Sequence, residues 1–215
     1  MWTYGKVTVR WLGHDGFVLE GSKTVIVDPF KAEGNYKADL LLISHEHFDH
    51  LSADDIKRFT TNSTKAIAPK LCKEALSQLG LAVTYVGVHS KTETDGMVIE
   101  TIPAYNLNKF RSPGQVFHPK GDGRVGYIIT LDGARFYHAG DTDAIPEMKG
   151  VDVDVAFLPV SGVYVMTAEE AVEAARMIKT KVVVPMHFGT MVGSKADAER
   201  FKRLTNCETK IMEKG

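Results

Sequence analysis

Residues 45–50 bring together side-chain types that bind metal ions. The segment follows the apolar run 40–43 and reads His45-Glu46-His47-Phe48-Asp49-His50. Imidazole nitrogens and carboxylate oxygens are ligands that suit zinc and neighbouring divalent metals. His45 and His47 are two residues apart on an extended turn, so both can bind one ion. Asp49 and His50 can bind a second ion beside it. A polar surface loop is the alternative, but three of the eight histidines fall here with alternating spacing, which favours a metal site.

Two further polar residues follow apolar runs later in the chain. Asp141 comes shortly after the run 134–138 and directly after Gly140, which permits a sharp turn. His187 directly follows the run 182–186. Taken alone, Asp141 is typical of a turn and His187 is as typical of a core as of a metal site. Because strand ends at one edge of a sheet bring their side chains together, both become candidate ligands beside residues 45–50.

The composition argues against several classes of partner. The chain has 215 residues, 44% of them hydrophobic, and a net charge of -1. It can therefore bury a substantial core, and it has no overall attraction for nucleic acid or an anionic membrane. Cys72 and Cys207 lie far apart without C-x-x-C spacing, which is typical of free thiols in a reducing compartment. No run has the length of a membrane span or the pattern of a signal peptide. We expect a cytoplasmic protein with a small-molecule substrate, and the sequence indicates no oligomeric state.

Alternating strands and helices must position these residues. The pattern predicts strands at 7–12, 17–20, 24–27, 40–44, 66–68, 97–103, 125–131, 134–138, 155–160 and 182–186. Helices are expected after the caps Ser52, Thr167 and Ser194, and over 71–79 before Gly80. A long loop covers about 106–123. We interpret residues 1–215 as one α/β domain with two similar layers.

These motifs together resemble the metallo-β-lactamase superfamily of hydrolases. The resemblance rests on H-x-H-x-D-H at 45–50, G-D-T at 140–142 and P-M-H-F-G-T at 185–190. Within the superfamily, residues 11–17, 27–30 and 138–142 resemble the branch related to L-ascorbate-6-phosphate lactonase. The resemblance implies an αββα sandwich, two mixed sheets flanked by helices, with a site for two metal ions at one edge. It assigns His45 and His47 to the first ion, Asp49, His50 and His187 to the second, and Asp141 to both.

The third histidine of the first ion is missing from its expected place. The strand 97–103 is followed by Asn106 where the family pattern requires histidine. His118, in the central loop, is the alternative ligand, and we favour it because zinc prefers nitrogen to an amide oxygen. A surface histidine and a turn asparagine are the structural interpretations of the two residues. If His118 is the ligand, Asn106→Ala should alter metal affinity little.

Three other polar residues belong to the motifs without an obvious role as ligands. Asp28 is expected to bond a ligand imidazole and determine its tautomer. His14 is a candidate substrate contact or extra ligand, and His138 is a candidate contact or an ordinary strand-end histidine. His89 shows no partner in the sequence and is expected to be exposed.

The resulting hypothesis is a metal-dependent hydrolase. Two divalent ions, Zn²⁺ first and Mn²⁺, Fe²⁺ or Ni²⁺ as alternatives, would supply a metal-bound hydroxide, with Asp49 as the catalytic proton acceptor. The substrate would be an ester, lactone, amide or phosphoester. Four basic residues of the central loop would suit an anionic substrate, or else form a solvated surface: Lys109, Arg111, Lys120 and Arg124.

Two other functions remain as alternatives. One is a non-catalytic or regulatory metal-binding protein, for which Asn106 is the support. The other is a diiron oxidoreductase on the same fold, although such relatives typically have glutamate where this chain has His47.

Overall fold

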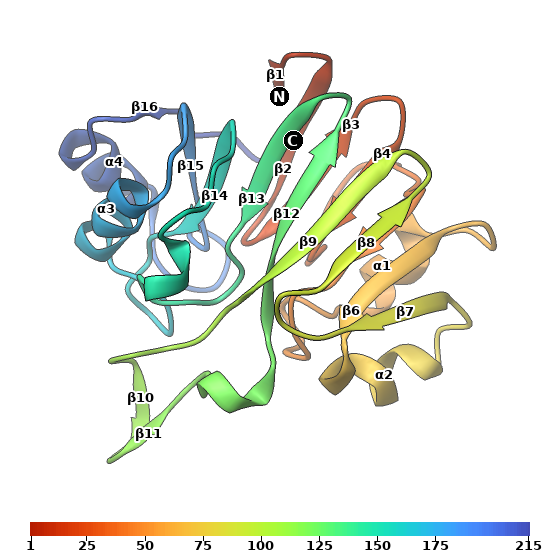
Figure 1. Cartoon of the computed structure of the whole chain (residues 1–215), viewed down its shortest axis with the longest axis horizontal. Coiled ribbons are helices and arrows are strands. Elements are labelled where there is room, and N and C mark those ends of the chain that lie inside the picture. The colour runs from red at the N-terminus through yellow and green to blue at the C-terminus, as the bar shows by residue number, and fades with distance from the viewer.

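Two seven-stranded sheets pack face to face between outer helices in the computed structural model, which describes residues 1–215 (Figure 1). The first sheet runs in chain order and is antiparallel from β1 to β4 and parallel from β4 to β7. Its strands are β1 (Trp2–Tyr4), β2 (Val7–Gly13), β3 (Gly16–Glu20), β4 (Thr24–Val27), β5 (Leu40–Leu42), β6 (Lys65–Pro69) and β7 (Ala82–Val86).

The second sheet has the order β16-β15-β14-β13-β12-β9-β8. Its strands β8, β9, β12 and β13 are antiparallel neighbours, and β13 to β16 are parallel. The strands are β8 (Lys91–Thr94), β9 (Met97–Pro103), β12 (Val125–Leu131), β13 (Ala134–His138), β14 (Val155–Pro159), β15 (Val182–Met186) and β16 (Glu208–Thr209). The short hairpin β10 (Phe110–Ser112) and β11 (Gln115–Val116) projects from the sandwich (Figure 1).

Helices cover the outer face of each sheet (Figure 1). They are α1 (Ala53–Phe59), α2 (Lys73–Ser77), α3 (Ala168–Met177) and α4 (Lys195–Leu204), with 3₁₀ turns at Lys70–Cys72, Lys120–Asp122 and Pro146–Met148. Ile56, Phe59 and Leu76 of α1 and α2 pack on the first sheet in a cluster of 14 buried residues. A cluster of 48 buried residues joins the two sheets, where Phe17 packs on Phe157, and extends to α3 and α4 on the second sheet. This architecture confirms the predicted sandwich.

The local signals account for most element boundaries. Thr167 begins α3 with a full capping box, and Ser52 accepts a hydrogen bond from the Asp55 amide at the start of α1. Asp132 and Gly133 both have positive φ, as the tight turn between β12 and β13 requires.

Some predicted elements differ from the structure. The helix expected over 71–79 is a 3₁₀ turn followed by the five-residue α2, and the strand expected over 40–44 is assigned only to Leu40–Leu42. Past Leu42 the chain still bonds to neighbours, since the amide of Ile43 donates to Ile67 and the carbonyl of Ser44 accepts from Val125. The strands β1, β7, β8, β10, β11 and β16 were not predicted. β8, β10 and β11 have no buried residues, so hydrophobic alternation could not reveal them.

Strand direction brings several loops to one edge of the sandwich. The strands β2, β4, β5 and β6 run in one direction within the first sheet, and β9, β13, β14 and β15 do so within the second. The polar motifs lie at the carboxyl ends of these strands. The C-terminal segment lies beside the carboxyl end of β2, where Lys214 forms a bridge with Trp11.

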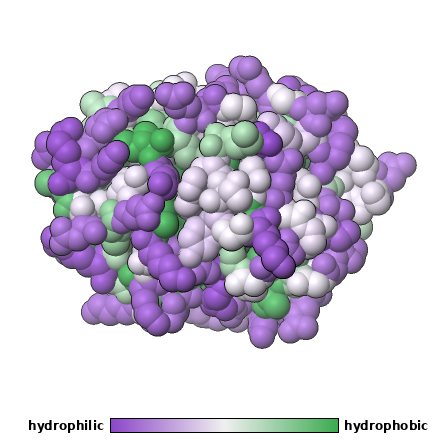
Figure 2. Space-filling view, turned by 90° about the horizontal axis from the view of Figure 1, so that it is seen from above, coloured by the Kyte–Doolittle hydropathy of each residue, from purple (hydrophilic) through white to green (hydrophobic).

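The surface seen from above is mostly hydrophilic, with small separate hydrophobic areas (Figure 2). No helix combines the length and the apolar character that a membrane span requires.

Candidate metal centre

Four side chains from three loops form a first group of metal donors. The group consists of His45, His47, His118 and Asp141, whose ligating atoms all lie within 4.8 Å of one another. His47 Nδ1 lies 3.0 Å from His45 Nε2 and 3.4 Å from His118 Nε2. Two nitrogens bound tetrahedrally to one zinc ion at about 2.0–2.1 Å lie about 3.3 Å apart. The spacing of the three imidazoles therefore fits a single ion.

A second group lies beside the first and shares Asp141 with it. Asp141 Oδ1 lies 3.3 Å from His50 Nε2 and 3.4 Å from His187 Nε2. Its other oxygen, Oδ2, lies 3.9 Å from His45 Nε2 and 3.7 Å from His118 Nε2. One carboxylate thus presents one oxygen to each group, which is the arrangement needed to bridge two ions.

The second group has buried polar atoms without partners. His50 Nε2, His187 Nε2 and Asp141 Oδ1 form no hydrogen bond within the protein, although each is inaccessible to solvent. An unpartnered buried polar atom is costly, and most such atoms in proteins are paired. A divalent cation would satisfy all three at once, so these residues fit a metal ion.

Asp28 determines which nitrogen two of the histidines present. Its carboxylate accepts a hydrogen bond from His50 Nδ1 at 2.9 Å and another from the hydroxyl of Ser44. Ser44 Oγ in turn lies 2.9 Å from His45 Nδ1 and accepts its proton. In the neutral form of each ring, the lone pair is therefore on Nε2. This geometry supports the predicted role of Asp28.

Ser161 determines which nitrogen His187 presents. Its Oγ lies 2.9 Å from His187 Nδ1 and donates onward to the carbonyl of Val163. Ser44 and Ser161 were not singled out in the sequence, where the only signal was a small polar residue shortly after each strand.

Burial and neighbouring charges favour the metal-binding forms of three histidines and two carboxylates. Burial lowers the pKa of His45, His47 and His118, to about 4 for His118, so these rings are neutral at pH 7. Burial would lower the pKa of His50 and His187 as well, but the charge of Asp141 raises the pKa of both rings. Burial would raise the pKa of Asp49, but the hydrogen bond from His14 and the charge of His50 lower it to about 2. Burial likewise opposes ionisation of Asp141, yet His187 and His50 hold its pKa well below the usual range. Both carboxylates are therefore ionised.

The structure brings His118 into the first group and places Asn106 behind it. His118 is only 1% exposed, and so it is not a surface histidine. Asn106 Oδ1 accepts a hydrogen bond from the His118 amide at 2.9 Å, and the Asn106 amide donates to the His118 carbonyl at 2.8 Å. Asn106 Nδ2 donates to the Tyr164 carbonyl at 2.9 Å. Asn106 therefore holds the backbone of His118 in position through these hydrogen bonds. We now expect Asn106→Ala to weaken metal binding, where the sequence suggested little effect.

The turn between β2 and β3 brings His14 and Asp15 to the second group. His14 Nε2 lies 3.1 Å from Asp49 Oδ2, and its ring packs on His187 with centroids 4.2 Å apart. Asp15 is fully buried, and neither carboxylate oxygen has a hydrogen-bond partner. Its carboxylate also falls in one cluster of possible metal donors with His50, Asp141 and His187. In the sequence, Asp15 stands out only as a member of the motif at 11–17, because an aspartate in a turn gives no sign of burial.

His138 supports this turn and has no contact with the donors. Its Nε2 donates to the Asp15 carbonyl at 2.8 Å, and its ring packs edge-on against Phe17. These contacts support the structural interpretation of His138, and the substrate contact stays a prediction. His89 is exposed, as expected.

The backbone at the site is held in unusual conformations. His14, Asp28 and His187 have φ of 52°, 41° and 58°, a left-handed region that is uncommon for residues other than glycine. Gly140 has φ of +63°, and a Cβ there would lie 3.2 Å from both Ser44 Cβ and the Val125 carbonyl. The glycine before Asp141 is thus required by its turn and by close packing. Such strain persists where the surrounding structure enforces it, and it gathers at functional sites.

The basic residues of the central loop pair with carboxylates. Lys109 Nζ lies 2.7 Å from Glu170 and 3.2 Å from Asp143, and Lys120 Nζ lies 2.7 Å from Glu147. Arg124 forms ion pairs with Glu46 and Asp122. Arg111 is exposed on β10. Three of the four basic residues are thus paired with carboxylates, and the anionic substrate stays a prediction.

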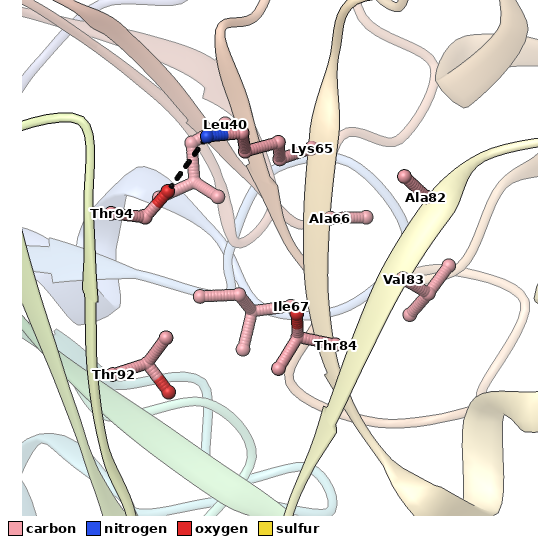
Figure 3. A pocket seen from close by; sticks show the side chains of 9 residues that line it. All are labelled: Leu40, Lys65, Ala66, Ile67, Ala82, Val83, Thr84, Thr92 and Thr94. Carbon is pink, nitrogen blue, oxygen red and sulfur yellow. Dashed lines mark hydrogen bonds between the residues drawn. The ribbon is translucent and has the colours of Figure 1, made fainter.

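A separate hollow of about 330 Å³ lies between β6 and β7 of one sheet and β8 of the other (Figure 3). Its walls are mainly alanine, threonine and aliphatic side chains, and Lys65 donates to Thr94 across it (Figure 3). No histidine, cysteine or carboxylate lines it.

Comparison with known proteins agrees with this geometry. The model of the β-lactamase superfamily domain matches residues 8–187. A UPF0173 metal-dependent hydrolase from Thermococcus kodakarensis is 35% identical over 96% of this chain and 95% of its own length. The chain belongs to the UPF0173 family of metal-dependent hydrolases, within the metallo-β-lactamase superfamily.

Solved structures of metal-dependent hydrolases share the fold over nearly the whole chain. A candidate metal-dependent hydrolase from Parabacteroides distasonis has a TM-score of 0.82 and 34% identity, and covers 96% of this chain and 93% of its own. A metallo hydrolase from Ignicoccus hospitalis has a TM-score of 0.78 and 25% identity, with 97% and 96% covered. The protein is therefore a metal-dependent hydrolase of this family. The narrower resemblance to L-ascorbate-6-phosphate lactonase stays a prediction.

Proposed function

We propose that this protein hydrolyses a small-molecule ester, lactone, amide or phosphoester at a site for two divalent ions. The observation that carries the proposal is the position of Asp141, which offers one oxygen to each of two histidine groups. His45, His47 and His118 would hold the first ion, and Asp49, His50 and His187 the second. Zn²⁺ suits the nitrogen-rich first group best, and Mn²⁺, Fe²⁺ or Ni²⁺ are alternatives.

Two ions so held would supply a hydroxide nucleophile near neutral pH and polarise the scissile bond. The chain's own residues prepare that reaction. Asp49 is ionised and only 17% exposed, and neutral His14 donates to its Oδ2, which orients the carboxylate toward the cavity. Asp49 can therefore accept the proton of the attacking water as the catalytic base.

The localisation and domain organisation remain proposals as well. A cytoplasmic protein is consistent with the free thiols Cys72 and Cys207. A single domain is consistent with the core cluster that both sheets share. The partner that we propose is a small molecule, and neither membrane nor nucleic acid is expected.

Metal stoichiometry tests the proposal directly. Protein purified without chelator and then loaded with metal should contain close to two equivalents of divalent ion per chain, measured by elemental analysis. Turnover of esters, lactones, amides and phosphodiesters should appear with the second equivalent. A reproducible value near zero would contradict the proposal, and a value near one without turnover would favour a non-catalytic metal-binding protein.

Asp15 is proposed as an additional carboxylate for the second ion, because its two oxygens are buried beside that group without partners. Asp15→Asn keeps the shape of the side chain and removes its charge. We expect the affinity for the second ion to fall by about 10–100-fold, as for other groups that support a metal site, while the first ion is retained. Titration with one metal, followed by calorimetry, measures both steps. Asp54→Asn, at an exposed carboxylate on α1, is the control. A lower melting temperature with unchanged affinity for both ions would show a purely structural role.

A further inference from the structure

The donors open into a hollow with an apolar wall. The hollow has a volume of about 320 Å³, and half of its eight lining residues are candidate metal donors. The other four are large and apolar or aromatic: Phe48, Phe117, Tyr164 and Met191. They come from four different loops, after β5, in the central loop, after β14 and after β15. The wall is therefore a product of the tertiary structure and could not be seen in any one segment.

This wall is exposed to an unusual degree for such side chains. Phe48 is 64% exposed, Tyr164 43% and Met191 47%. A single exposed apolar residue is ordinary, but several gathered at one mouth mark a surface that binds something apolar. Because these residues border Asp49 and Asp141, the bound group would lie next to the reacting bond.

The wall is also held in place before anything binds. The rings of Phe117 and Tyr164 pack edge to face with centroids 4.6 Å apart. Asn106 bonds to the Tyr164 carbonyl, and the Phe117 amide donates to the Lys109 carbonyl. The ring of Phe48 packs edge to face on Phe30. A pre-formed apolar surface loses little conformational freedom when a ligand enters.

No basic side chain lines the hollow to receive a second anionic group. Its only charged residues are the candidate ligands, and Lys109, Lys120 and Arg124 nearby pair with carboxylates. A carboxylate or phosphate placed against this wall would lose its water without gaining an ionic partner.

We propose that the hollow selects substrates by an uncharged apolar or aromatic group attached directly to the scissile bond. This inference rests on the proposed hydrolase function and names its substrate class. It replaces the anionic substrate that the basic loop residues suggested in the sequence. The group fits between the donors on one side and the rings of Phe117 and Tyr164 on the other.

Affinity for a ligand series tests the inference without requiring turnover. Metal-loaded protein is titrated by calorimetry with alkyl hydroxamates, whose two oxygens chelate the ions, from acetohydroxamate to hexanohydroxamate. Each methylene should tighten binding about fourfold until the hollow is full. Adipic monohydroxamate, which carries a carboxylate in place of the terminal methyl group of hexanohydroxamate, should lose most of that gain.

Two variants locate the effect. Met191→Lys places a cation in the wall. It should abolish the gain in affinity per methylene and tighten binding of adipic monohydroxamate, with metal content unchanged. Val88→Lys adds the same charge at an exposed residue between β7 and β8 and should behave as the unmodified protein. A flat alkyl series, stronger binding of the carboxylate-terminated ligand by the unmodified protein, or no hydroxamate binding would overturn the inference. Absence of turnover with two ions bound and a normal alkyl series would instead reject the hydrolase function.

Discussion

Asp49→Ala should reduce the rate of hydrolysis by about 10²–10⁴-fold, the range that a positioned general base contributes. The variant removes both the proposed proton acceptor and a ligand of the second ion, so the loss should reach the upper part of that range. The fold should be retained, because the only hydrogen bond to the Asp49 carboxylate comes from His14. The measurement is kcat/KM on the best substrate with metal content determined on the same sample.

Two further variants separate the roles of Asp49. Asp49→Asn keeps an oxygen that can bind a metal but cannot accept the proton, so it should retain more metal than Asp49→Ala while remaining nearly inactive. Asp54→Ala removes an exposed carboxylate close by on α1 and should change neither quantity. Activity of Asp49→Ala within about tenfold of the unmodified protein would be too small a loss for the proposed role.

His118→Ala should cause the largest selective loss of metal. It removes one of three nitrogens from the first group and none from the second, so one of two binding steps should weaken strongly and the other little. Metal titration resolves the two steps. His89→Asn is the matched control, since it removes an exposed imidazole and asparagine tolerates the left-handed backbone at that position, where φ is 57°. Equal weakening of both steps, or of neither, would remove His118 from the first site.

Asn106→Ala tests whether the hydrogen bonds of the Asn106 side chain are needed to hold His118 in position. The variant deletes the hydrogen bonds to the His118 amide and the Tyr164 carbonyl but leaves every ligand in place. We expect it to reproduce the selective effect of His118→Ala in weaker form, about 10–100-fold in affinity for the first ion. Asn108→Ala, which removes exposed hydrogen bonds to Glu170 and Lys109, should have little effect. A normal first binding step in Asn106→Ala would show that the rest of the loop positions His118 unaided.

The sequence alone, through its motifs and the family that they resemble, determined the fold class and named most of the candidate donors. Residues 45–50, Asp141 and His187 each follow an apolar run, and parallel strands necessarily bring such ends to one edge of a sheet. Asp28 was expected to support a ligand because it belongs to the motif at 27–30. The caps of α1, α3 and α4 were visible because capping depends on residues only three apart.

Only the tertiary structure decided the contacts that depend on distant segments. His118 faces His47 across 71 residues of chain, in a loop without hydrophobic periodicity, and Asn106 could be understood only once that loop was seen. The burial of Asp15 and the pairing of Lys109 with Glu170 likewise depend on which loops meet. Local patterns specify strands and turns because those interactions span a few residues. The environment of a charged or polar side chain depends on elements far away in sequence, and that environment determines whether it binds a metal, supports a ligand or is neutralised.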